Sequence, residues 1–191
     1  MSRKTISAMI FTTIIGIAVY AQNTPVAAPG AALYVYSHTD SPAPLPDADP
    51  IVAVVDNSDQ FSKLNVQKNN ETKKFHNQPV FLVWNGYVEI PAKGKYTFAL
   101  SFDHSGTSGW CHDNVIVKIG TKNILNISKT SEKLKENDSR TLSLEKGDYE
   151  FTIIFKLAEA HQRSPFSLKM WNRNKPLKKT NITPATMYHA E

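Results

Sequence analysis

Apolar and polar residues alternate along several stretches of the chain. Residues 96–102 place tyrosine, phenylalanine or leucine at every second position, with threonine, alanine and serine between them. Residues 115–119 and 149–155 repeat this two-residue period, which puts the apolar side chains of a strand on one face. Residues 80–90 are rich in β-branched and aromatic side chains, and residues 166–170 alternate again. We therefore predict a β-strand at each of these five places.

The rest of the chain adds shorter strands and turns. Residues 33–37, 51–55 and 141–144 predict three further strands. Glycine-containing turns at 91–94 and 145–148 predict that the strands on either side of each turn form a β-hairpin. We find no repeat of fixed period and no pattern for a helix longer than two turns. The predicted fold class is all-β, a sandwich or barrel of antiparallel strands.

Aromatic residues on these strands are expected to fill a single core, because large rings bury much apolar surface. The eight core candidates are Trp84, Tyr96, Phe98, Phe102, Tyr149, Phe151, Phe155 and Phe166. A packing role is the expected one for each of them, in preference to contact with a cofactor or ligand.

Residues 1–21 have the pattern of a secretory signal peptide. Arg3 and Lys4 precede an uncharged, mostly apolar run at residues 8–19, and the small residue Ala21 stands before the expected cleavage point. That run is too short to span a membrane comfortably. We expect a secreted protein, located in the periplasm, at the cell surface or in the medium.

Removal of the leader would leave a chain of one-domain length. Residues 22–30 are expected to form a flexible N-terminal tail and residues 31–191 a single β domain. No later apolar stretch is long enough to be a transmembrane helix, so we expect no membrane span after cleavage.

Charge is unevenly distributed along the chain. The 191 residues include 22 basic and 17 acidic side chains, a net charge of +5, and loss of Arg3 and Lys4 with the leader lowers this to +3. Residues 22–62 contain five aspartates and no lysine or arginine, whereas residues 169–179 place five basic side chains around Trp171. Export excludes nucleic acid as a partner. The basic end is therefore expected to face an anionic glycan, a cell surface or the acidic segment.

Five short motifs, in this order, resemble those of a known family. They are WNGYV at 84–88, PAKGKYTF at 91–98, SFDHSG at 101–106, LEKGDY at 144–149 and LKMW at 168–171. With a first strand at 33–37, the chain from about residue 31 to residue 188 resembles the protective-antigen propeptide-like (PA14) domain. The resemblance implies a jelly-roll type β-sandwich that commonly binds carbohydrate or contacts another protein in secreted glycosidases, adhesins and toxins.

The segment 103–114 is the chemically densest part of the chain. Its candidate ligand-binding residues are Asp103, His104, Trp110, Asp113 and Asn114. In calcium-dependent adhesins of the resembled family, two adjacent aspartates in this loop hold the ion, which also ligates a sugar. Asp103 matches the first of these positions, but His104 stands at the second, and calcium prefers oxygen ligands. Calcium is thus a candidate cofactor, with Asp103 and Asp113 as its candidate ligands.

Other uses of this segment stay open. Trp110 can stack on a sugar ring or cover the end of the core. His104, Cys111, His112 and Asp113 are competent ligands for zinc or copper, although adjacent residues on a strand point to opposite faces. Cys111 is the only cysteine, which excludes an internal disulfide framework.

The sequence shows no nucleophile elbow and no paired carboxylates of a glycosidase type. We therefore expect a non-catalytic module that binds carbohydrate or a cell-surface receptor, as an adhesin or colonisation factor does. The alternative is a structural or accessory subunit of a surface fibre or secreted complex, with a protein partner and no small ligand.

Overall fold

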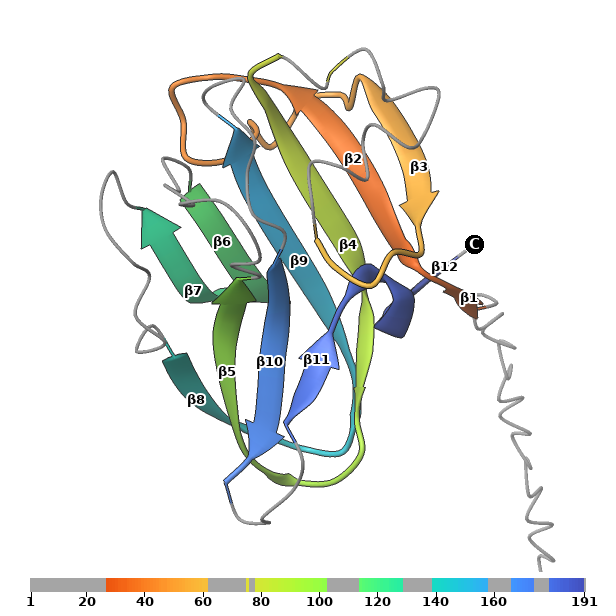
Figure 1. Ribbon diagram of the computed structural model, residues 1–191, viewed down its shortest axis with the longest axis vertical. Coiled ribbons are helices and arrows are strands. Elements are labelled where there is room, and N and C mark those ends of the chain that lie inside the picture. The colour runs from red at the N-terminus through yellow and green to blue at the C-terminus, as the bar shows by residue number, and fades with distance from the viewer. Residues whose placement is uncertain are drawn as a thin grey trace, which may run out of the picture.

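The computed structural model describes residues 27–61, 75, 78–102, 114–128, 139–157, 166–173 and 179–190. Strands dominate this part of the chain, with one 3-10 helix, η2 (Pro184–Thr186), near its end (Figure 1). The strands are β1 (Ala27–Pro29), β2 (Ala31–Ser37), β3 (Val52–Asp56), β4 (Val80–Ile90), β5 (Gly94–Phe102), β6 (Asn114–Ile119), β7 (Lys122–Ser128), β8 (Ser139–Leu144), β9 (Gly147–Leu157), β10 (Phe166–Asn172), β11 (Thr180–Ile182) and β12 (Tyr188–Ala190).

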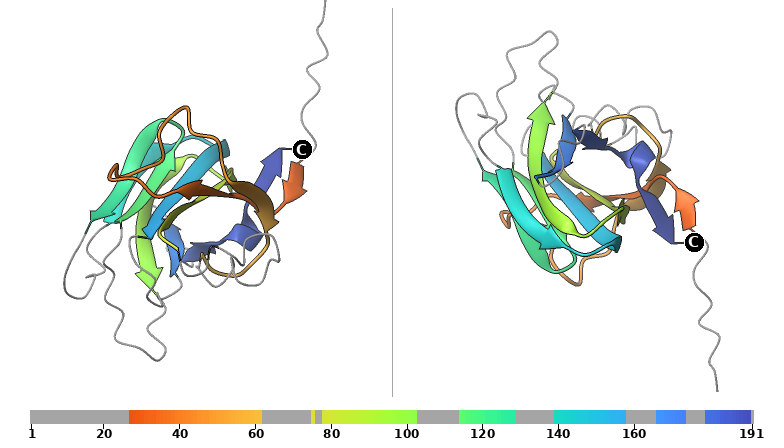
Figure 2. Two further views of the ribbon diagram at one scale, coloured as in Figure 1. Left: turned by 90° about the horizontal axis from the view of Figure 1, so that it is seen from above. Right: turned by 90° about the horizontal axis from the view of Figure 1, so that it is seen from below.

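The strands form two antiparallel sheets. The larger sheet has the order β1-β12-β4-β9-β6-β7, and β2 pairs with both β3 and the first half of β4. The smaller sheet has the order β11-β10-β5-β8. Seen along the long axis of the molecule, the two sheets lie on opposite sides of the core (Figure 2). The predicted all-β fold of antiparallel strands, a β-sandwich, is confirmed.

The two turns predicted to close hairpins instead connect the two sheets. β4 and β5 flank the first turn but belong to different sheets, and the same holds for β8 and β9 at the second turn. β4 pairs along its whole length with β9, which also has eleven residues. The hairpin prediction is wrong because a tight turn fixes only where the chain reverses. Matching of the buried faces of the two longest strands, β4 and β9, decides that they pair.

The alternation of apolar and polar residues did not predict four of the strands. β1, β11 and β12 have three residues each, too few to show a period. In β7 the adjacent residues Ile124 and Leu125 are both buried, and the register with β6 shifts between Val117 and Lys118. Such a bulge breaks the two-residue period that makes a strand visible in a sequence.

The core between the sheets is aromatic, as predicted. Of the eight candidates, Trp84, Tyr96, Phe98, Phe151, Phe155 and Phe166 are buried, and Tyr149 is half-buried and packs against them. For Phe102 the structure describes the backbone but not the side chain. Phe61, which follows β3, joins the cluster through a backbone bridge to Phe166 and a ring-centroid distance of 5.4 Å to the same residue.

One buried carboxylate lies at the edge of this core. Asp56, the last residue of β3, accepts a hydrogen bond of 2.8 Å from the indole nitrogen of Trp84 through Oδ2. Its Oδ1 accepts hydrogen bonds from the backbone nitrogen and the hydroxyl of Ser58, at 3.0 and 2.6 Å. Trp84 is fully buried, so Asp56 provides the partner that its polar N–H requires. The sequence analysis assigned Asp56 only to an acidic, turn-rich segment.

The two ends of the described chain lie together. β1 pairs with β12, with Ala27 opposite Ala190, and both views of Figure 2 show β1 beside the C-terminal end. Three residues of the predicted tail, Ala27–Pro29, thus form a paired strand. Residues 1–26, with the predicted leader and the rest of that tail, lie outside the described residues. Among those described, no helix is both long and apolar enough to cross a membrane.

Candidate functional site

One end of the sandwich carries the segment that the sequence analysis selected. β5 ends at Phe102 in the smaller sheet, and β6 begins at Asn114 in the larger one. Residues 103–113 therefore connect the two sheets at this end. β9 ends and β4 begins at the same place, because Leu157 pairs with Val80. We call this region the loop end.

The structure places one of the five predicted ligand-binding residues. Asn114 is half-buried and pairs with Ser128 of β7. The next residue, Val115, faces the core between the sheets, and alternation therefore puts Asn114 on the outer face of the larger sheet. Asp103, His104, Trp110 and Asp113 lie outside the described residues, and so does the proposed calcium site of Asp103 and Asp113. In the described ranges, histidine, cysteine and acidic side chains form no group of three suited to a metal ion.

The outer face beside Asn114 has a small core of its own. Phe81, Val83, Ile116 and Ile154 are buried there, with Tyr34, Tyr36 and Ala43 packed against them. Ala43 belongs to the connection between β2 and β3, which crosses this face. The larger sheet is thus covered on both sides near the loop end, which explains why β4 is apolar at successive positions.

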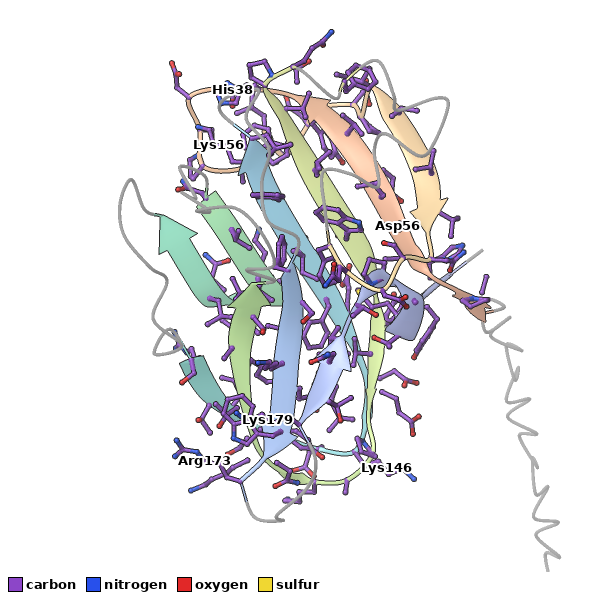
Figure 3. All side chains as sticks on the ribbon, viewed as in Figure 1. His38, Asp56, Lys146, Lys156, Arg173 and Lys179 are labelled. Carbon is purple, nitrogen blue, oxygen red and sulfur yellow. The ribbon has the colours of Figure 1, made fainter. Side chains whose placement is uncertain are left out.

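His38 and Lys156 contact this outer cluster. The imidazole of His38 stacks on Phe81, with ring centroids 5.8 Å apart and an interplanar angle of 14°. Lys156 Nζ lies 5.7 Å from the same ring centroid and donates a hydrogen bond of 2.9 Å to the carbonyl oxygen of Ser41. Figure 3 shows His38 and Lys156 close together at this end of the molecule. The sequence analysis missed the group, because Ser41 and Lys156 are far apart in the chain.

Two polar atoms beside this cluster are shielded from solvent without a protein partner. His38 Nε2 and Thr39 Oγ1 have no hydrogen bond among the described residues. A buried polar group without a partner is destabilising, so a bound water molecule is the expected partner of each atom. Beside this buried group, the partly buried rings of Tyr34 and Tyr36 are aromatic groups that a ligand could contact.

A second cluster of polar side chains lies on the larger sheet, near the end of β4 that is away from the loop end. Tyr87 and Tyr188 stack with ring centroids 5.5 Å apart and an interplanar angle of 23°. Glu89 pairs with Asp148 across β4 and β9. Burial, a hydrogen bond to Asp148 and the negative charges of Asp148 and Glu89 raise the pKa of Tyr188 to about 12. The phenol is thus held in its protonated form by the folded protein.

We expect this tyrosine to be visible in an alkaline titration. A pKa raised on folding gives stability that is complete below the ordinary tyrosine pKa and is lost as pH rises towards 12. Absorbance of tyrosinate should therefore include a late step near pH 12 that belongs to Tyr188. Tyr188→Phe should remove that step, and Asp148→Asn should move it to lower pH. A late step that persists in Tyr188→Phe would assign it to another tyrosine.

Several solved structures have a fold similar to that of this chain. An anti-sigma factor domain-containing protein from Clostridium clariflavum is 16% identical with a TM-score of 0.57 and covers 86% of this chain. The chain in turn covers 48% of that structure, about half its length. The A domain of epithelial adhesin 6 from Candida glabrata, solved with Galβ1-3GlcNAc, is 14% identical with a TM-score of 0.55. This match covers 87% of this chain and 89% of the adhesin domain.

A PA14 sugar-binding domain from an RTX adhesin is 10% identical with a TM-score of 0.50, and the match covers 85% of this chain and 98% of that domain. No curated protein matches the sequence. The model of the PA14 domain family matches residues 28–180, which include every strand from β2 to β10. The motifs that suggested this family are therefore confirmed, and the chain belongs to the PA14 domain family.

Proposed function

We propose that the protein is a secreted, non-catalytic carbohydrate-binding domain of the adhesin type, which binds a glycan or a glycosylated cell-surface receptor at the loop end. The observation that carries this proposal is the position of segment 103–113. It joins the two sheets of a PA14 domain at one end and has the highest density of polar and aromatic ligand groups in the chain. An adhesin domain of similar fold was solved with a disaccharide.

This proposal gives a role to each of the five candidate ligand-binding residues. Trp110 stacks on the apolar face of a sugar ring, and Asn114 hydrogen-bonds to sugar hydroxyl groups. Asp103 and Asp113 supply carboxylate oxygens, the ligands that calcium prefers, so they would hold the ion if it is present. The imidazole of His104 is a poor calcium ligand and fits a hydrogen bond to the sugar better.

Trp110→Ala is expected to abolish or weaken glycan binding without unfolding the domain. A glycan array with the full chain, repeated with Trp110→Ala, measures this directly. Loss of one stacked ring should lower the affinity about tenfold or more. Trp171→Ala is the matched control, because this tryptophan lies on the smaller sheet, and it should bind the same neutral glycans as the original chain.

The array should be run with calcium and again with a chelator. Signal that disappears in the chelator would show that glycan binding requires calcium, as the proposed ligands Asp103 and Asp113 predict, whereas unchanged signal would show that it does not. Equal binding by Trp110→Ala and the original chain would contradict the proposed site. An array without any bound glycan would contradict the proposed function.

A specific observation favours an assembly subunit as the second candidate. Leu45, Ile51 and Val55 are the large apolar side chains exposed among the described residues; Ile51 and Val55 lie next to and on β3, and Leu45 belongs to the connection between β2 and β3. Within the described strands, β3 pairs with β2 alone, which leaves its other edge open to a further strand. An added strand from a fibre or complex partner would cover this edge, and an empty glycan array would leave this candidate standing.

A further inference from the structure

The outer face of the smaller sheet carries basic side chains around one tryptophan. Tyr96, Phe98, Leu168 and Met170 face the core, so the residues between them face outward. We call Lys95, Lys169, Trp171, Arg173 and Lys179 the basic face. Lys95, Arg173 and Lys179 are exposed, and Lys169 and Trp171 are half-buried.

Strand register arranges these residues in rows. Trp171 lies opposite Thr97, and Thr97 lies opposite Thr141, to which it is joined by a hydroxyl hydrogen bond of 2.8 Å. Lys179 Nζ lies 5.2 Å from the centroid of Trp171 and occupies the other end of this row. The row places an indole and an ammonium group at one end and the exposed Thr141 at the other, with the fully buried Thr97 between them.

Basic residues flank the tryptophan row on both sides. Lys169 lies opposite Ala99 on one side, and on the other the backbone nitrogen of Arg173 donates a hydrogen bond of 2.8 Å to the carbonyl oxygen of Lys95. Successive outward residues of a strand are about 7 Å apart, so the two flanking rows are about 13 Å apart. Positive charge therefore lies on either side of the half-buried Trp171, while the small residues Thr97 and Ala99 of the same face are buried.

The strands of the smaller sheet differ from those of the larger one in their acidic residues. The four strands β5, β8, β10 and β11 contain no aspartate or glutamate. Glu145, which follows β8, forms an ion pair of 2.7 Å with Lys93. The larger sheet, by contrast, carries Glu89, Asp148 and Glu150 on β4 and β9. The larger sheet also carries Lys118, Lys122 and Lys156, so its charges are mixed, whereas the charged residues on the strands of the smaller sheet are all basic.

We propose that the basic face binds an acidic polysaccharide, whose sulfate or carboxylate groups contact Lys95, Lys169 and Arg173 while a sugar ring contacts Trp171. The spaced cations fit charges that repeat along a polymer, and the half-buried ring of Trp171 between them fits a sugar ring. A membrane surface fits less well, because the exposed large apolar side chains of the described residues belong to β3 and the connection before it, and none belongs to the strands of this face. This surface is additional to the loop end: in Figure 3, Arg173 and Lys179 lie at the end of the molecule opposite His38 and Lys156.

The test compares two charge-matched double variants of the full chain. Lys169→Gln/Arg173→Gln removes two charges from the basic face, and Lys118→Gln/Lys122→Gln removes two from β6 and β7 of the other sheet. Affinity for heparin and for polygalacturonate, measured by titration calorimetry, should fall about tenfold in the first variant and less than twofold in the second. Heparin and polygalacturonate separate sulfate from carboxylate recognition. Trp171→Ala should also lower the affinity for the polysaccharide that binds more tightly.

Several results would overturn the proposal. An equal loss in both double variants would show that net charge alone attracts the polymers, and absence of binding to either polysaccharide would exclude the ligand class. Equally tight, equally sensitive binding to vesicles of anionic lipid or to duplex DNA would show general polyanion attraction. Trp110→Ala should keep polysaccharide binding, so failure of the loop-end proposal and failure of this one give different results.

Discussion

Phe166→Ala is expected to destabilise the protein by about 3–5 kcal/mol, the usual cost of removing a fully buried phenylalanine ring. Phe166 begins β10 and touches both sheets. Its ring centroid lies 5.4 Å from Phe61, 5.4 Å from Phe155 and 6.5 Å from Trp84. The substitution leaves a cavity among three rings that the backbone cannot easily close, since Phe166 and Phe61 are also joined by two backbone hydrogen bonds.

Denaturation in urea, followed by tryptophan fluorescence and by circular dichroism, measures this loss. Phe166→Leu is the control, because it keeps most of the apolar volume and should cost less than half as much. Val55→Ala, at an exposed position, should change the free energy of unfolding by at most about 0.5 kcal/mol. A loss below about 1 kcal/mol in Phe166→Ala would contradict the central position given to this ring.

Asp56→Ala is expected to cost about 3 kcal/mol or more, although it removes a polar residue from an edge strand. The variant leaves the buried indole nitrogen of Trp84 and the backbone nitrogen of Ser58 without their carboxylate acceptor. Hydrogen bonds to a charged group contribute more than neutral ones, and an unpaired buried donor carries the full desolvation cost. Asp56→Asn should lose less, since its single carbonyl oxygen can satisfy one of the two sides.

A double-mutant cycle with Trp84→Phe separates this interaction from general effects. Phenylalanine keeps most of the ring volume and removes the N–H, so Asp56→Ala should cost about 1–2 kcal/mol less in that background. Additive free energies of unfolding would show that the 2.8 Å contact contributes nothing.

Much of the sandwich was predictable because its strands bury one face. β5, β6 and β10 begin or end within two residues of their predicted bounds, and the bounds of β4 match. In β5 and β10, packing of one face against the core imposes a two-residue period on the sequence, whereas β4 was predictable from its run of β-branched and aromatic residues. Pairing was not predictable in the same way. β4 and β9 pair although 56 residues separate the end of one strand from the start of the other, and neither turn motif carries that information.

The candidate sites differ in the same way: one could be found from the sequence, and the others depend on which strands pair. Residue types alone made segment 103–114 a candidate, because its ligand groups are neighbours in the chain. The cluster of His38, Phe81 and Lys156 depends on the register that sets Ser37 opposite Val80 and Val80 opposite Leu157. The basic face likewise needs the pairing of β5 with β10, which brings Lys95 next to Arg173. The sequence pattern showed the basic residues of the C-terminal segment but not the strand that completes their surface.

The pairing of β1 with β12 has a mechanical consequence. Because Ala27 lies opposite Ala190, the chain enters and leaves the described fold at the same end of one short antiparallel pair. A pulling force applied through both termini would therefore open this pair one hydrogen bond at a time, as a zipper opens. Only after that would tension reach Gly30, whose backbone nitrogen bonds to Met187, and then the long strands. The core is shielded from tension by a three-residue strand that can be lost first.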